Sequence, residues 1–210
     1  MNRRSVVFAL LTTACATSHG AFVGDSLEGA TLSVSSLDVN GDGSDDVVQV
    51  YQGDNKTVAM VTYYDLDRGG LLLYDITTTD IPINDSSFFS GDVNGDGLED
   101  MYLGGAAGQA GTLFLQQADE TLVEAPSQPW KQDAASEDID AHFFDADGDG
   151  DQDLYVTSGG NDFPEGSPAL ADRLYINQGN GQFAKSNKIP VVKTSGGVAV
   201  SGDVDNDGDL

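Results

Sequence analysis

Cysteine and basic residues are scarce in this sequence. Its 210 residues include one cysteine, Cys15, and 9 lysines and arginines against 35 acidic residues, a formal net charge of -26. Nucleic-acid binding needs lysine and arginine clusters that replace phosphate counterions, and the chain offers only Arg3 and Arg4. We therefore exclude DNA and RNA as partners. A chain with one cysteine also has no intrachain disulfide, so an exported form needs another stabiliser, such as bound metal.

Helical periodicity and catalytic motifs are lacking as well. No stretch repeats apolar residues at helical spacing, and 26 glycines separate short apolar runs. His142 lies in one of these runs, where a packed strand residue is a simpler interpretation than a catalytic base. The sequence contains no Gly-x-Ser-x-Gly motif. We therefore expect an all-β protein that is not an enzyme.

Residues 1–20 have the layout of a secretory signal peptide. A basic start precedes an apolar run, residues 6–14, that is too short to span a bilayer, and small residues follow at a cleavage site. This predicts a secreted protein without a transmembrane segment in the mature chain. In the alternative, Cys15 is the lipid-modified residue of a bacterial lipoprotein. If the source is a eukaryote, Asn55 and Asn84 are glycosylation acceptors.

An Asp-rich pattern of nine residues occurs four times, the last time incompletely, at residues 38–46, 92–100, 145–153 and 203–210. We call these copies the first to the fourth loop. Their first residues are 53 to 58 positions apart, which indicates a structural repeat. Short β-type runs flank them, such as residues 142–144 before the third loop and residues 198–200 before the fourth. Each loop is therefore predicted to join two strands.

A second match supports the repeat. Residues 113–122 and 174–183 correspond position for position, and their apolar runs around polar turn residues predict a β-hairpin. A unit of about four strands fits a β-propeller blade, with a linear β-solenoid as the alternative.

The predicted boundaries follow from the period. Residues 21–210 are expected to form the repeat region, about three to four blades of a partial propeller. Since the fourth loop stops before its ninth position, we expect the sequence to be part of a longer chain. The expected repeats lie near residues 30–80, 85–125, 137–185 and 195–210.

The loops have the pattern of calcium sites. Oxygen ligands at positions 1, 3 and 5 converge on one point when position 6 is a glycine, as it is in all four loops. Oxygen donors without histidine or cysteine suit a hard cation, and the backbone carbonyl at position 7 and a carboxylate at position 9 favour Ca²⁺ over Mg²⁺. The predicted ligands are Asp38, Asn40, Asp42, Ser44 and Asp46; Asp92, Asn94, Asp96, Leu98 and Asp100; Asp145, Asp147, Asp149, Asp151 and Asp153; and Asp203, Asp205 and Asp207.

The loop pattern has two other interpretations. An EF-hand needs a glutamate at position 12 and flanking helices, whereas position 12 here is Gln49, Leu103 or Val156 in a predicted strand. Solvated Asp/Gly turns without an ion are the simpler alternative, and the fourfold repetition argues against them. Crowded carboxylates repel one another without a cation, so calcium is expected to contribute to folding.

The loop pattern D-x-[DN]-x-D-G-x-x-D between strands, at this period, resembles the FG-GAP and VCBS repeats of integrin-like β-propellers. From Ser90 onward, residues 104–106, 153–161 and 172–177 are similar to the repeat region of ASPIC/UnbV-type proteins, the group that includes cartilage acidic protein. The resemblance implies calcium-carrying loops and a role in extracellular binding or adhesion. It brings no catalytic residues with it.

We therefore expect a secreted, calcium-binding β-propeller protein that acts as an extracellular binding or adhesion module toward a protein or a glycan. The alternative is the non-catalytic, calcium-stabilised propeller part of a longer extracellular enzyme, such as a polysaccharide-active one. A third hypothesis is that calcium itself takes part in sugar binding. Residues 161–172 are a candidate contact loop, although a tolerated insertion is the simpler interpretation. Trp130 is expected to pack between repeats.

Overall fold

The computed structural model describes residues 32–37, 46–52, 59–65, 70–76, 88–119 and 121–205. The first four of these stretches and Phe88 are described in their backbone only. All described residues belong to the compact unit Thr31–Leu210. No helix among them has the length and apolar composition that crossing a bilayer requires. The predicted signal peptide, residues 1–20, lies outside the described residues, as do Asn55 and Asn84.

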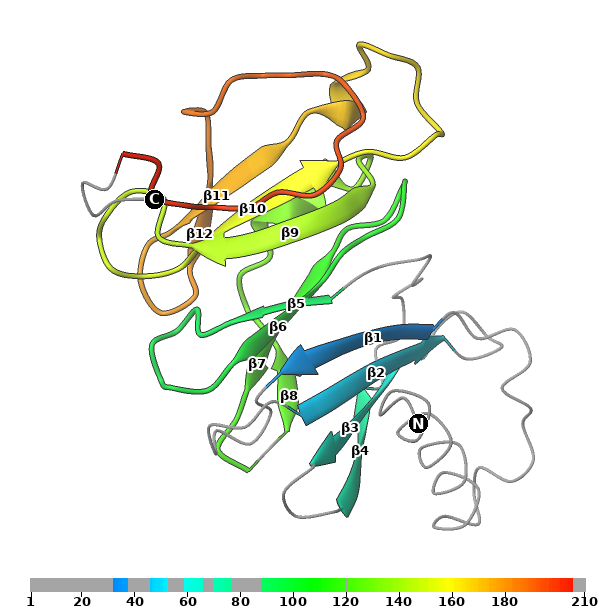
Figure 1. Ribbon diagram of the computed structural model, residues 1–210, viewed down its shortest axis with the longest axis vertical. Helices are drawn as coiled ribbons and strands as arrows, with labels where there is room; N and C mark the ends of the chain where they lie inside the picture. The colour runs from blue at the N-terminus through cyan, green and yellow to red at the C-terminus, as the bar shows by residue number, and fades with distance from the viewer. Residues whose placement is uncertain are drawn as a thin grey trace. The chain divides into compact units, whose positions relative to one another are not determined.

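Twelve strands form three four-stranded antiparallel sheets in the described residues (Figure 1). The first sheet contains β1 (Leu32–Leu37), β2 (Asp46–Gln52), β3 (Ala59–Asp65) and β4 (Gly70–Ile76). The second contains β5 (Phe88–Gly91), β6 (Asp100–Leu103), β7 (Thr112–Gln116) and β8 (Leu122–Glu124). The third contains β9 (Asp138–Phe144), β10 (Asp153–Ser158), β11 (Arg173–Asn177) and β12 (Phe183–Ser186).

In every sheet, strands that follow each other in the chain are neighbours. This order needs only short connections, and it matches the blades of a β-propeller. The structure thus confirms the predicted all-β class and the four-stranded unit, and the sheets are partial propeller blades. Two short 3₁₀ helices, η1 (Pro129–Asp133) and η2 (Pro168–Leu170), interrupt the connections.

The second and third sheets repeat the same register. Both predicted hairpins are present, as β7–β8 and β11–β12. The central strand β6 is buried along its whole length, as expected for a strand covered on both faces. The same positions are paired between the second and third strands of each sheet. In the second sheet Met101 pairs with Phe114 and Tyr102 with Leu113, and in the third sheet Leu154 pairs with Tyr175 and Tyr155 with Leu174.

Trp130 packs between the second and third sheets, as predicted. Its side chain is 1% exposed, and its ring meets three aromatic rings edge-on or steeply inclined. The centroid distances are 5.3 Å to Tyr102 of β6, 5.6 Å to Tyr175 of β11 and 5.6 Å to Phe183 of β12. Such pairs contribute about 0.5–1.5 kcal/mol each beyond the buried area. The two sheets therefore share one hydrophobic core.

The predicted strand at residues 198–200 is wrong. Val198 and Val200 are each 86% exposed, and no described segment pairs with them as a strand. The segment is instead held against the third sheet by polar contacts, such as the one from Ala199 N to Asp140 Oδ2 at 2.6 Å. High β-propensity forms a strand only where a neighbouring strand accepts its backbone hydrogen bonds.

The insertion at residues 161–172 is anchored to the rest of the third repeat. It contains η2, whose Leu170 is 2% exposed, and Ala171 forms an isolated antiparallel bridge with Lys193. Gly166 N also donates to Lys193 O at 3.0 Å. Part of this insertion therefore packs against the chain, and its predicted role as a contact loop stays a prediction.

Candidate metal centre

The second and third loops each join the first two strands of a sheet, β5 to β6 and β9 to β10. A chain that reverses within a few residues needs left-handed backbone, and both loops place glycines there. Position 6 was predicted, and it has φ angles of 87° at Gly97 and 95° at Gly150. Position 4 was missed, although Gly95 and Gly148 have φ angles of 76° and 81°.

A signal for position 4 exists in the sequence. The first three loops have glycine there, and the fourth has Asn206, the side chain that tolerates left-handed backbone best after glycine. The loop geometry therefore depends on two glycine positions.

The aspartate at position 1 shapes the loop through backbone hydrogen bonds. In the third loop, Asp145 Oδ1 accepts from Gly148 N at 2.7 Å and from Asp149 N at 3.2 Å. Asp145 Oδ2 accepts from Gly150 N at 3.0 Å. The second loop repeats all three bonds, which reach Asp92 from the backbone N atoms of Gly95, Asp96 and Gly97.

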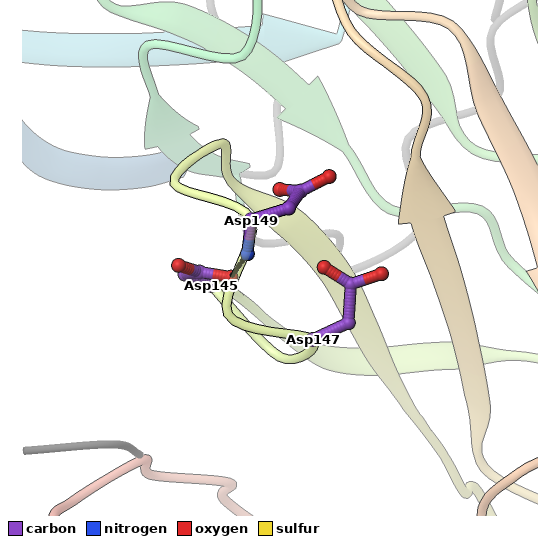
Figure 2. Close-up of side chains that lie close together, drawn as sticks. All are labelled: Asp145, Asp147 and Asp149. Carbon is purple, nitrogen blue, oxygen red and sulfur yellow. Dashed lines mark hydrogen bonds between the residues drawn. The ribbon is translucent and has the colours of Figure 1, made fainter.

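The third loop brings three predicted ligands together (Figure 2). One oxygen each of Asp145, Asp147 and Asp149 lies within 4.8 Å of the other two. Two oxygens on one calcium ion are at most about 5 Å apart, because each Ca–O bond is about 2.3–2.6 Å long. Asp147 and Asp149 are exposed, so a cation could approach from solvent. The donor set and its spacing fit Ca²⁺.

The second loop has an amide at position 3 in place of a carboxylate. Asn94 Nδ2 donates to Asp96 Oδ2 at 3.0 Å, and Asn94 Oδ1 accepts from Asp96 N at 2.9 Å. The backbone N of Leu98 donates to Asp96 Oδ1 at 2.9 Å, as Asp151 N donates to Asp149 Oδ1 at 3.1 Å in the third loop. The two loops are therefore folded alike, and the second has one acidic group fewer at positions 1, 3 and 5.

The aspartates at position 9 have a second role that the sequence did not reveal. Asp100 and Asp153 begin β6 and β10 and are 0% exposed. In each, Oδ2 accepts from the backbone N of position 2, and Oδ1 accepts from the last residue of the third strand of the sheet. These carboxylates therefore connect each loop to the third strand of its sheet through hydrogen bonds. The remaining lone pairs of their oxygens could still bind a cation.

Burial and neighbouring negative charges raise the pKa values of the position 9 carboxylates. Burial raises the pKa of Asp100 to about 6, and the charges of Asp96 and Asp92 add to the rise, against the hydrogen bonds from Gln116 and Val93. Burial likewise raises the pKa of Asp153, with smaller contributions from Asp147 and Asp149. A bound cation would relieve both the repulsion and the desolvation.

Asp151 was predicted to contribute only its backbone oxygen. Burial, followed by the charge of Asp149, raises the pKa of the Asp151 side chain to about 6. Its Oδ1 is buried and has no hydrogen-bond partner within the described part of the chain. The side chain of Asp151 is therefore another carboxyl group near the third loop, and burial and the neighbouring aspartates disfavour its ionised form.

The remaining predicted ligands are described only in part. In the first loop, residues 38–45, which include Asp38, Asn40, Asp42 and Ser44, lie outside the described residues. Asp46 begins β2, which is described in its backbone alone. In the fourth loop Asp203 and Asp205 are exposed, and Asp207 lies outside the described residues.

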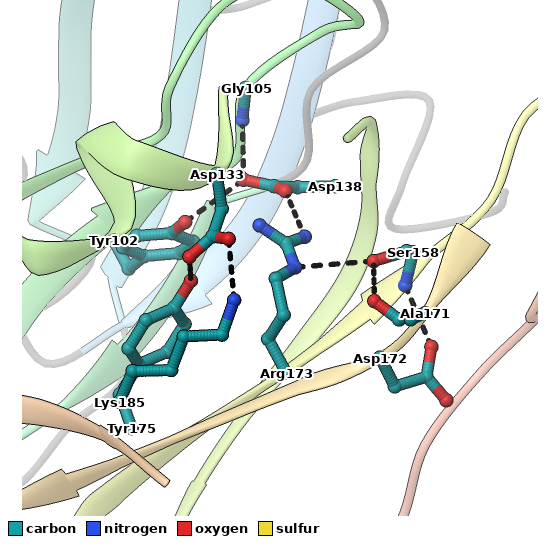
Figure 3. Close-up of polar contacts among 10 residues, drawn as sticks. All are labelled: Tyr102, Gly105, Asp133, Asp138, Ser158, Ala171, Asp172, Arg173, Tyr175 and Lys185. Atoms are coloured by element: carbon teal, nitrogen blue, oxygen red, sulfur yellow. Dashed lines mark hydrogen bonds and ion pairs between the residues drawn. The ribbon is translucent and has the colours of Figure 1, made fainter. Parts of the chain in front are cut away.

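A separate charged cluster lies between the second and third sheets (Figure 3). Asp138 of β9 accepts from Arg173 Nη2 at 2.5 Å, from Tyr102 Oη at 2.9 Å and from Gly105 N at 2.9 Å. Asp138 and Arg173 are almost fully buried. Ser158 continues the cluster, since its Oγ accepts from Arg173 Nε at 3.2 Å. Arg173 neutralises Asp138 within the third sheet, and the bonds from Tyr102 and Gly105 connect this pair to the second repeat.

The family comparison agrees with this geometry. A model described as the FG-GAP-like repeat matches residues 92–156 and residues 145–210, which together cover more than half of the chain. The first match begins at the second loop and the second match at the third loop, so both start at an Asp-rich turn. A search of curated proteins finds no match.

Proposed function

Because this chain belongs to the FG-GAP-like repeat family, we propose that its β-propeller module binds calcium at the Asp-rich loops and serves extracellular binding or adhesion. The third loop carries the calcium proposal, since three carboxylate oxygens there lie within 4.8 Å of one another. The equivalent backbone hydrogen bonds of the second loop support it. Asp145, Asp147 and Asp149 would hold the ion, with Asp153 at the base of the loop.

Calcium would supply positive charge where the fold crowds carboxylates. An ion bound to the third loop would hold three side chains of one turn together, and would thereby fix the connection between β9 and β10. The chain has a net charge of -26 and a single cysteine. Stabilisation by metal therefore replaces the disulfides that many extracellular modules use.

The extracellular location rests on the predicted signal peptide at residues 1–20, with residues 21–210 as the repeat region. We also propose that the protein is related to the ASPIC/UnbV-type group, because residues 104–106, 153–161 and 172–177 are similar to the repeat region of that group. Lipid anchoring through Cys15 is the alternative to free secretion. Mass spectrometry of the exported protein separates the two, because only the lipoprotein begins with a modified Cys15.

We propose a non-catalytic role, with an extracellular protein or glycan as the partner. His142, the one histidine in the described residues, has its Nε2 2.7 Å from Ser201 Oγ and its ring stacked on Phe144. The third-loop carboxylates would hold the metal, and Asp138 is paired with Arg173. Turnover of a polysaccharide by the purified chain would contradict this proposal.

Calcium binding is tested by thermal unfolding of the full chain in Ca²⁺, in Mg²⁺ and in EDTA. At a free concentration of about 100 times Kd, a ligand stabilises the folded state by about 2.7 kcal/mol per site. For a protein of this size that raises Tm by roughly 5–10 °C per site. We expect the rise with Ca²⁺, and a smaller one with Mg²⁺. The same Tm in Ca²⁺ and EDTA would refute stabilisation by calcium.

Binding is tested on arrays of glycans and of extracellular matrix proteins, each probed in Ca²⁺ and in EDTA. A calcium-stabilised module should bind one class of partner and lose that binding in EDTA as the loops loosen. Direct participation of calcium in sugar binding would instead show as loss of glycan binding under conditions where circular dichroism reports an unchanged fold. Absence of binding to both arrays would count against the adhesion proposal.

A further inference from the structure

Asn177, the last residue of β11, connects the second loop to the third. Its side chain is 1% exposed. Asn177 Nδ2 donates to Val93 O in the second loop at 2.7 Å and to Gln152 O in the third loop at 3.1 Å. Its Oδ1 accepts from Gly179 N at 3.1 Å. One buried amide therefore satisfies a backbone carbonyl of each loop.

The hydrogen bonds continue from Asn177 to the position 9 carboxylates of both loops. Asn177 N donates to Asp153 Oδ1 at 2.7 Å. On the other side, Val93 donates its own N–H to Asp100 Oδ2 at 3.1 Å. Hydrogen bonds thus connect Asp100 to Asp153 through the backbone N–H and C=O of Val93 and through the side-chain amide and backbone N–H of Asn177.

The equivalent position in the second sheet shares the backbone bond of Asn177. Gln116 ends β7, and its N donates to Asp100 Oδ1 at 2.9 Å, as Asn177 N does to Asp153. Its side chain is also buried, but Oε1 has no hydrogen-bond partner within the described part of the chain. The backbone bond is thus common to both repeats, and among the described residues a side-chain bridge between two loops is seen at Asn177.

We propose that Asn177 couples the second and third loops, so that calcium at one raises the affinity of the other. The inference rests on the proposed calcium binding. A buried amide that loses a partner is costly, so displacement of either carbonyl, Val93 O or Gln152 O, disfavours the native position of Asn177. Ordering one loop therefore lowers the entropic cost of ordering the other, which gives positive coupling.

Electrostatics acts in the opposite direction. A cation at one loop reduces the negative charge that attracts a cation to the other. This effect does not depend on Asn177, and salt at about 0.15 M screens it beyond about 8 Å. A variant of Asn177 therefore separates the coupling through the amide from the coupling through charge.

The test is a Ca²⁺ titration of the full isotope-labelled chain by NMR at physiological salt. The amide signals of Gly97 and Gly150 report on the two loops, since each N–H bonds to the aspartate at position 1. Asp96→Ala disables the second loop and Asp149→Ala the third. We expect each to weaken binding at the other loop by about fivefold or more, and by equal factors, because coupling is reciprocal.

The titrations are repeated with Asn177→Ser, whose hydroxyl is too short to bridge both carbonyls. The ratio of the Ca²⁺ dissociation constants at one loop, measured with the other loop disabled and with it intact, should then fall below about twofold. Asn177→Gln, which carries the side chain found at Gln116, is the second variant should the serine variant not fold. Gln178→Ala, at the exposed neighbouring residue, is the matched control and should keep the full ratio.

Two negative outcomes are distinguishable. If both glycine signals report calcium binding but the ratio is the same with Asn177 and with its variants, the coupling is refuted and calcium binding stands. If neither signal moves at millimolar Ca²⁺, the proposed calcium function itself fails, and the coupling with it.

Discussion

At the scale of single residues, aspartates of the same loop differ in their burial and in their hydrogen bonds to the backbone. Asp145 accepts three backbone hydrogen bonds and shapes the turn, whereas the exposed Asp147 takes no part in the backbone bonds described for that loop. Asp153 is buried and braces the sheet. The sequence pattern presents all of them as equivalent ligands, because it does not show which carboxylates also bond to the backbone.

This difference predicts how two substitutions separate stability from metal binding. In EDTA, Asp145→Ala should lower the free energy of unfolding by about 1–3 kcal/mol, because it leaves three backbone N–H groups without their acceptor. Asp147→Ala should change it by less than about 0.5 kcal/mol. Both should weaken the stabilisation by Ca²⁺. Urea denaturation with and without Ca²⁺ measures these effects, and equal losses in EDTA would contradict the structural role of Asp145.

Asp100 predicts a pH dependence of the calcium-free protein. Folding raises its pKa from the ordinary value of 3.8 to about 6, so the folded chain binds this proton more tightly than the unfolded chain. The contribution to stability is therefore present below about pH 4 and is lost as the pH rises to about 6. We expect this group to lower the free energy of unfolding by about 3 kcal/mol over this range in EDTA.

Denaturation of the full chain between pH 4 and pH 7 measures this loss. Asp153 is shifted in the same direction by burial and adds to it. Saturating Ca²⁺ should abolish the loss, because the cation favours the ionised carboxylates. Stability that rises with pH over this window in EDTA would show that the loop carboxylates are not desolvated in the calcium-free chain.

At the scale of elements, the strands, hairpins and loops follow from neighbouring residues. The β7–β8 and β11–β12 hairpins form where apolar runs flank polar turns, and the loops turn where glycine permits left-handed backbone. Residues 198–200 show the limit of this reasoning. They have the β-branched pattern of a strand, but no described strand pairs with them, and the backbone N of Ala199 donates to the side chain of Asp140 instead.

The loop glycines give a prediction at this scale. Gly150 has a φ angle of 95°, and an added Cβ would meet nothing within 4 Å, so Gly150→Ala strains the backbone without a steric clash. We expect Gly150→Ala to lower the free energy of unfolding in EDTA by about 1–2 kcal/mol. Gly197→Ala is the control, since Gly197 also has open space but no left-handed backbone. Chemical denaturation in which both variants lose the same stability would contradict a conformational origin.

At the scale of the whole molecule, contacts between sheets join the second and third repeats. Trp130 fills the space between Tyr102, Tyr175 and Phe183. Asp138 ties Arg173 of its own sheet to Tyr102 and Gly105 of the neighbouring repeat. A charged pair removed from water depends on both partners, so this contact is sensitive to the loss of either.

We expect Asp138→Ala to cost about 3–5 kcal/mol, because it leaves Arg173 buried and unpaired. Arg173→Met should cost less, since Asp138 keeps its bonds from Tyr102 and Gly105. Lys131→Ala is the control: the Lys131–Glu124 pair has an N–O distance of 2.8 Å but is exposed, and its loss should cost under about 1 kcal/mol. Equilibrium unfolding ranks the three variants, and a similar cost for Lys131→Ala and Asp138→Ala would refute the role of burial.

The loops, the hairpins and the all-β class follow from residues close in the chain, as in the third loop, where the three converging carboxylates span Asp145 to Asp149. The period follows from the spacing of the loops along the sequence. Trp130 was predicted to pack between repeats because the hydrophobic effect buries a large apolar ring. The rings that surround it could not be named from sequence.

Contacts between residues far apart in the chain are visible in the three-dimensional structure and not in the sequence. Asn177 reaches Val93 across 84 positions, and Arg173 reaches Asp138 across 35. Such contacts follow from how one sheet packs against the next, and neither local propensity nor periodicity encodes that packing. Asp100 and Asp153 differ from the other aspartates of their loops for the same reason. The surrounding sheet buries them, which raises their pKa and lets them hydrogen-bond to both loop and sheet.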